Sequence, residues 1–324
     1  MKRIKRSQLL LAFLTGFLFF AALPVLASEG GVTSSTELEL QITSIPEARL
    51  CFIQGFTFPF LRGSGPMTRG NNINTLFTLE LTPLSVNGIG EITLTPAAFF
   101  LLHGGGRAGS GWDIPIGYGM GINRPVDTAD GNAGRPRQAV IDGGSFDGLV
   151  WSAWGAGTVQ FDLGAVLPGD WNHVLFQTRQ EMRYSAFTRA APGESWLFEN
   201  DHGENKNGWM YFARYVIGYS MPRSPVLNMI AFMAELEKFL YNTPGGDFWG
   251  EDLGRWVFSG LLEFTITPRF NATFGVQMET HRNHGTSNFG NRGYFYQDFP
   301  LITEGGSRRL LFYRAALILN YSLR

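Results

Sequence analysis

The chain has 324 residues, a formal net charge of −1 and one cysteine. Charges of both signs are mixed along it, which excludes the basic surface that nucleic-acid-binding proteins present, and a single cysteine excludes an internal disulfide framework. Aromatic residues make up 14% and glycines number 41, a high share of both for a soluble domain. After residue 27 no apolar run is long enough to span a bilayer as a helix. The mature chain is therefore either exported and soluble or inserted in a membrane in another form.

The first 27 residues carry the features of a secretory signal peptide. A basic "MKRIKR" is followed by the apolar run "LLLAFLTGFLFFAAL", which Pro24 closes. Val25 and Ala27 occupy the minus-three and minus-one positions of a small-residue cleavage site. We expect residues 1–27 to be removed, so that the mature protein begins at Ser28 outside the inner membrane.

A period of two runs through the rest of the sequence. In 176–189, "FQTRQEMRYSAFTR", charged or polar side chains alternate with apolar ones, so that a strand here has one apolar and one charged face. Segments of about ten alternating residues are typical of transmembrane β-strands. Nine further segments alternate in this way: 49–61, 73–82, 90–102, 148–167, 209–221, 228–240, 255–267, 270–280 and 310–323.

The connections between these segments support the same interpretation. Short turns (83–88, 168–171, 222–225, 268–270) alternate with longer polar loops (62–72, 105–146, 190–208, 243–253, 285–307). Short periplasmic turns and long outer loops are the layout of outer-membrane barrels. The sequence thus predicts an all-β fold, a single antiparallel transmembrane β-barrel of about ten strands over 49–324, with a long outer loop at 105–146.

Two further segments make twelve strands the alternative count. "TELELQIT", within the lead-in 28–48, alternates cleanly, and so does "WDIPIGYGMGIN" at 112–123. The first is either a lead-in or an extra strand. The second either extends a hairpin above the membrane, folds inward as a plug, or supplies a strand.

Several short sequence segments carry a resemblance to a narrower group of proteins. "FTFPFLRGSGPMTRGNN", "GDWNHVLF", "ESWLFENDHGENKNG" and "TPGGDFWGEDLGRW" resemble segments of a group of uncharacterised spirochaete (treponemal) outer-membrane proteins. The resemblance implies a place in the bacterial outer membrane, with lipid and the outer-membrane assembly machinery as partners. It implies no activity. The chain departs from the common barrel pattern at its end, "NYSLR", where a terminal aromatic residue is usual.

Charged residues at mid-strand fall on the face that a barrel turns inward. They predict a belt of both signs across the lumen, and the candidate pore-lining residues are Arg179, Glu181, Arg183, Arg214, Glu235, Glu237, Glu279 and Arg314. In one interpretation these side chains pair and fill the bore, as in small barrels. In the other they line a narrow water path. We expect a porin-like passage for small polar solutes; the alternative is a non-conducting surface barrel whose loops bind extracellular partners.

A search for catalytic and metal-binding sets finds none with suitable spacing. Asp201 and His202 are adjacent in an outer loop, but they lack the spacing and the second acidic pair of barrel proteases. His284 and Ser287 lie three residues apart and would point to opposite faces of a strand. The same spacing argues against His281 and His284 as joint metal ligands. An outer-membrane hydrolase is therefore disfavoured, and no cofactor is expected.

Overall fold

A computed structural model describes residues 31–45, 47–115, 118–126, 138–165, 167, 173–199, 201, 205–221, 224–240, 254–282 and 308–323. The predicted signal peptide, 1–27, lies outside these residues. Within them, no helix has the length and apolar character needed to cross a membrane.

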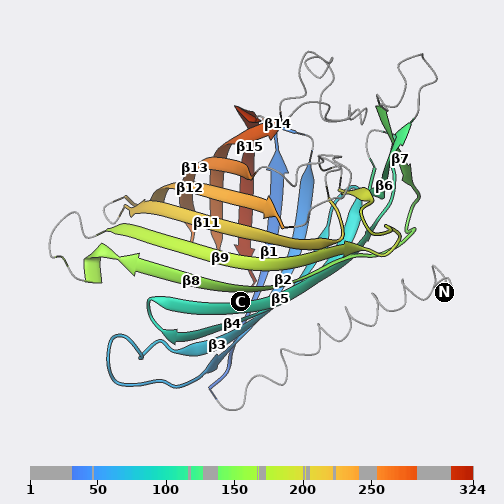
Figure 1. Cartoon of the computed structure of the whole chain (residues 1–324). Coiled ribbons are helices and arrows are strands. Elements are labelled where there is room, and N and C mark those ends of the chain that lie inside the picture. Colours follow the sequence, from blue (N-terminus) through green and yellow to red (C-terminus); the bar gives the residue numbers. More distant parts are fainter. Residues whose placement is uncertain are drawn as a thin grey trace.

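Twelve antiparallel strands close into a barrel (Figure 1). Each strand pairs with its sequence neighbours in the barrel, and β1 pairs with β15 to close it, from Glu37 opposite Ser322 to Thr43 opposite Ala316. The strands are β1 (Thr33–Thr43), β2 (Ala48–Pro59), β3 (Asn72–Leu81), β4 (Ser85–Ala97), β5 (Phe100–Gly111), β8 (Val150–Asp162), β9 (Val174–Phe187), β11 (Gly208–Ser220), β12 (Leu227–Phe239), β13 (Arg255–Thr267), β14 (Phe270–Arg282) and β15 (Arg308–Ser322).

The count of twelve is the higher of the two predicted values, and only one of its two extra strands was anticipated. β1 is the "TELELQIT" segment of the lead-in. The other extra strand is β5, because the segment predicted as one strand over 90–102 divides at residues 98–99 into β4 and β5. β5 continues through "HGGGRAGSG", whose glycines are depleted in strands and therefore hid it.

The two ends of the barrel differ in the length of their connections. At one end, the long connections 112–149, 188–207, 240–254 and 283–307 occur together with two short turns, 44–47 and 82–84. At the other end, where β1 begins and β15 ends, the connections are 60–71, 98–99, 163–173, 221–226 and 268–269. Three predictions need correction. Residues 62–72, predicted as a long outer loop, lie at the end with the strand termini, and the predicted short turn 83–88 lies at the long-loop end, where 82–84 connect β3 to β4. The long loop begins at residue 112 because 105–111 pair with β4 and β8.

Segments of the 112–149 and 188–207 loops form a small sheet that is separate from the barrel. β6 (Met120–Val126) pairs with β7 (Gln138–Gly143) on one side and with β10 (Ser195–Phe198) on the other. Figure 1 shows β6 and β7 projecting past the ends of the barrel strands. Of the three predicted roles for 112–123, the hairpin above the membrane is the one the structure adopts. A buried apolar cluster joins the small sheet to the barrel strands β8 and β9, and it consists of Met120, Ile122, Val150, Phe187, Trp196 and Phe198.

Apolar side chains cover the outer face of the barrel. Phe176, Met182 and Ile217 are each more than two-fifths exposed, an arrangement that water would disfavour and lipid favours. Trp151, Tyr184 and Trp209 form a row of rings at the long-loop end, with centroids 5.5 Å apart. Such aromatic girdles mark the membrane interface of outer-membrane barrels, and closure leaves no unpaired strand edge in lipid. The chain is an integral outer-membrane β-barrel with the long loops outside.

A β-bulge in β15 changes which side chains face inward. The register with β14 shifts between Gln277, which is opposite Arg314, and Met278, which is opposite Phe312. The extra residue is Tyr313, whose ring lies 4.7 Å from the Arg314 guanidinium carbon and 5.6 Å from that of Arg255. Strict alternation predicted Leu311 and Tyr313 on the lipid face. The bulge makes that prediction wrong for both residues, because a bulge inserts one residue without a partner.

Candidate functional site

The eight candidate lumen residues lie on five strands, β9, β11, β12, β14 and β15, which together with β13 form one continuous part of the wall. One ion pair shows which side of the barrel wall they face. Arg179 Nη2 on β9 lies 3.3 Å from Glu91 Oε2 on β4, although β8 and β5 lie between these strands in the sheet. In a closed barrel such a contact passes through the interior. The residues of β9 in phase with Arg179, namely Gln177, Glu181 and Arg183, therefore face inward too.

Three of the candidates form one cluster on β9. Glu181 is buried to 1% exposure and accepts hydrogen bonds from Arg179 Nη2 at 2.8 Å and from Arg183 Nε at 2.8 Å. Two guanidinium groups on one buried carboxylate satisfy the charge that burial would otherwise make costly. On the neighbouring strands, Arg214 Nη2 lies 2.7 Å from Glu235 Oε1, as their predicted opposite positions suggest.

The remaining candidates pair differently from the prediction. Glu279 and Arg314 were expected level with each other. Instead Glu279 accepts from Arg255 at 2.8 Å, and Arg255 also lies 3.2 Å from Glu237. Arg314 reaches Glu47, in the turn after β1, at 2.6 Å. In the observed register Arg314 lies opposite Gln277 and Glu279 lies opposite Leu311, so the two charged residues are not level.

Several charged residues of the lumen were absent from the predicted set. Glu80 on β3 accepts from Arg49 at 3.1 Å and from Arg107 at 3.0 Å, and Glu91 accepts from Trp154 Nε1 at 3.1 Å. Arg107 was missed because its strand was interpreted as a loop. The signal was present, since His103, Gly105, Arg107 and Gly109 alternate with Gly104, Gly106 and Ala108.

One carboxylate enters the lumen from an outer loop. Glu199, directly after β10, accepts hydrogen bonds from Ser85 Oγ, from Asn87 Nδ2 at 2.7 Å and from Arg107 Nη2 at 2.7 Å. Its backbone adopts the left-handed conformation, with φ of 55°, which is uncommon for a residue other than glycine. Burial acts to raise the pKa of Glu199, but the charge of Arg107 and the hydrogen bonds outweigh it, so the pKa lies below its ordinary value. The ionised side chain attaches the 188–207 segment to the inner wall.

The ion pairs follow the barrel wall. Where both partners lie on barrel strands, they belong to the same strand, to neighbouring strands or, at most, to strands three steps apart around the ring of twelve, as for Arg179 and Glu91. Opposite walls are six steps apart. In the part of the chain that the structure describes, no ion pair connects opposite walls. The charges therefore line the lumen.

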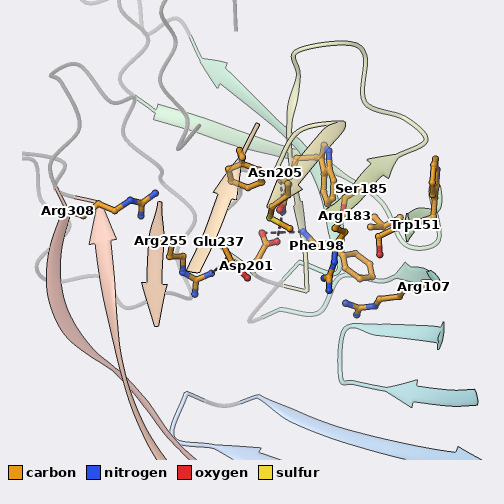
Figure 2. Close-up of a pocket in the computed structure, with 15 residues that line it drawn as sticks. Arg107, Trp151, Arg183, Ser185, Phe198, Asp201, Asn205, Glu237, Arg255 and Arg308 are labelled. Atoms are coloured by element: carbon orange, nitrogen blue, oxygen red, sulfur yellow. Dashed lines mark hydrogen bonds and ion pairs between the residues drawn. The ribbon is translucent and has the colours of Figure 1, made fainter. Parts of the chain in front are cut away.

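A cavity of about 290 Å³ lies in the lumen at the long-loop end (Figure 2). Seven barrel strands contribute to its lining, from β5 round to β15, together with β10. We call this cavity the outer vestibule. Figure 2 shows Arg255, Glu237 and Arg308 on one side of it and Arg107, Arg183 and Phe198 on the other. The vestibule thus reaches across the barrel beneath the loop sheet.

Of the candidates for other chemistry, Asp201 lines the outer vestibule. Asp201 accepts hydrogen bonds from Asn205 and the backbone N–H of Phe198, as a loop residue does. His202, His284 and Ser287 fall outside the described residues, and so does the side chain of His281. No group of three or more potential metal ligands occurs in the described ranges.

Comparisons with known proteins find solved structures of distant sequence. No protein-family model matches the chain, and no curated protein matches it. Among solved structures, a KdgM porin is similar over 90% of this chain and 99% of its own, with a TM-score of 0.38 and 9% identity. The translocator domain of autotransporter NalP from Neisseria meningitidis covers 97% of this chain and 96% of its own, with a TM-score of 0.38 and 11% identity. An anion-selective porin from Comamonas acidovorans covers 90% and 99%, with a TM-score of 0.31 and 6% identity.

Proposed function

We propose that the barrel is a narrow, porin-like passage for small polar solutes across the outer membrane. The observation that carries this proposal is the course of the ion pairs along the wall. A filled barrel needs side chains that meet across the bore. Here the paired charges remain beside the strands that bear them, and the outer vestibule leaves open volume between opposite walls.

The number of strands agrees with a passage of limited width. Eight strands enclose an interior that side chains just fill, and sixteen or more leave an aqueous channel. Twelve strands lie between these cases, and the inner wall is polar and charged. Water and small hydrogen-bonding solutes are stabilised by such a wall, whereas apolar solutes gain nothing from it. Selection by size and charge follows, as with the charged rings of other channels.

Swelling of protein-loaded liposomes in neutral sugars of increasing size tests the proposal. We expect swelling with a pentose, slower swelling with a hexose, and much slower swelling with a disaccharide. A Glu237→Ala variant removes one of the two carboxylates on Arg255 and should change these rates. Equal swelling of loaded and empty liposomes, with protein shown to be folded, would contradict the proposal and favour a surface barrel that acts through its loops.

A further inference from the structure

The outer vestibule presents arginine more than carboxylate. Four arginines line it, Arg107, Arg183, Arg255 and Arg308, against two acidic residues, Asp201 and Glu237. The difference is two positive charges. Three of the other carboxylates that hold these arginines, Glu80, Glu181 and Glu279, lie in the wall with side chains 4%, 1% and 1% exposed. The fourth, Glu199, comes from the outer loop, and its side chain is 16% exposed. The side chains of Arg107, Arg183 and Arg255 are 28%, 33% and 23% exposed. A solute in the cavity therefore meets guanidinium groups.

Two of these guanidinium groups keep donors for a ligand. Arg183 gives Nε and Nη2 to Glu181, and Arg107 gives Nη2 to Glu80 and Glu199. Within the described residues, Nη1 of each makes no hydrogen bond. A guanidinium donates in a planar fork that matches carboxylate and phosphate oxygens. Arg183 can therefore still present Nη1 and the second N–H of Nη2 as a fork, whereas Arg107, whose Nη2 already donates twice, can hold an oxyanion through Nη1.

Aromatic rings hold both groups in place. The guanidinium carbon of Arg183 lies 5.1 Å from the centre of the Trp154 ring, and that of Arg107 lies 5.2 Å from the centre of the Phe198 ring. The carboxylate on one side and the ring on another restrict each side chain. Little conformational freedom is then left to lose when a ligand binds, which favours affinity.

We propose that the outer vestibule binds small organic anions through a carboxylate or phosphate group held by Arg183 and Arg107. This inference rests on the proposed passage, because it names the class of solute that the mouth of that passage retains. It deepens the proposal from size selection to recognition of an oxyanion. A neutral solute of the same size would enter without being held.

Current block in planar bilayers tests the proposal with four matched probes. Gluconate carries a carboxylate, glucose 6-phosphate a phosphate, glucose no charge and glucosamine a positive charge. We expect gluconate and glucose 6-phosphate, added on the long-loop side, to interrupt the current at concentrations where glucose and glucosamine do not. If only one of the two anions blocks, it identifies which oxyanion the vestibule takes. If all four act alike on an open channel, the anion site is wrong while the passage stands.

Arg183→Gln is the decisive variant, because Glu181 keeps its bond to Arg179 and the barrel should still fold. Loss of a charge-assisted contact weakens binding by roughly tenfold or more, so block by the anions should need at least about that much more solute. Arg269→Gln is the control, since residues 268–269 connect strands at the opposite end. Unchanged block in Arg183→Gln would overturn the assignment.

Calorimetric titration of the folded protein in detergent with glucose 6-phosphate tests the site without conduction. Heat of binding in the wild type and its loss in Arg183→Gln would support the anion site even in a barrel that does not conduct. No heat in the wild type would overturn it. The two proposals can thus fail separately.

Discussion

Glu199 is the residue on which the position of an outer loop depends. Its carboxylate is the point at which the 188–207 segment meets the lumen wall, through Ser85, Asn87 and Arg107. Glu199→Gln keeps the shape but removes the charge, and a hydrogen bond to a charged group contributes about 1.5–3 kcal/mol. We expect the segment to detach more often, giving a noisier current and faster tryptic cleavage after Arg189.

The matched control is Glu194→Gln in the same segment, where the carboxylate accepts only a local hydrogen bond from Ala191 N–H. This variant should leave both readouts near those of the wild type. Equal cleavage rates for Glu199→Gln and the wild type would show that the loop sheet is held by its apolar core alone.

The pH at which this attachment fails follows from the lowered pKa of Glu199. A carboxyl group whose pKa is lower in the folded state contributes stability above its unfolded pKa, and loses it as the pH falls through the folded one. The attachment should therefore be intact from neutral pH down to about 4.5, the ordinary value, and fail only below it. A spin label at Pro192→Cys, with Cys51→Ser to remove the native thiol, would report mobility across this range. Mobility that already rises between pH 7 and pH 5 would contradict the account.

At the scale of the element, β5 depends on a glycine that no side chain could replace. A Cβ on Gly105 would lie 2.5 Å from the Trp154 ring and 2.7 Å from the carbonyl oxygen of Gly90. Neighbouring Gly104 has nothing nearer than 4.0 Å. Forcing atoms into such a space costs about 1–3 kcal/mol. Gly105→Ala should lower the midpoint of urea unfolding in micelles, and Gly104→Ala should change it little. Equal unfolding midpoints for Gly105→Ala and the wild type would show that the Trp154 side chain moves to accommodate the added methyl group.

The same strand shows how much of the fold could be predicted from the sequence. β9 was recognisable because large apolar and charged side chains alternate over its whole length. β5 was not recognisable, because its glycines have no side chains that could mark an apolar and a polar face. Arg107, which lies on this strand, was therefore not predicted to line the lumen. The inward position of Tyr313 depends on a bulge in β15. A bulge depends on the pairing of two strands, which the sequence of one strand does not contain.

At the scale of the whole molecule, side chains alternate between the lipid face and the lumen face along each strand, except where a bulge such as that in β15 interrupts the alternation. Phe232 on β12 is half exposed on the outer face, and Met233 beside it faces inward. An arginine facing lipid near the midplane costs about 2–4 kcal/mol, whereas one in the lumen does not. Phe232→Arg should therefore fold poorly into vesicles, and Met233→Arg should fold but alter conductance. Folding is read from migration of unheated protein on a gel. A higher folding yield for Phe232→Arg than for Met233→Arg would mean that the lipid and lumen faces are assigned wrongly.

The most direct test of the central claim is single-channel conductance of the folded barrel in a planar bilayer, with Arg183→Ala and Glu237→Ala beside it. A charge-lined passage predicts discrete steps in the wild type whose size or ion preference shifts in both variants, because both side chains line the vestibule. A silent bilayer, from protein whose migration shows that it is folded and inserted, would contradict the account. The charges of the lumen would then serve to close the barrel, and its outer loops would carry the function.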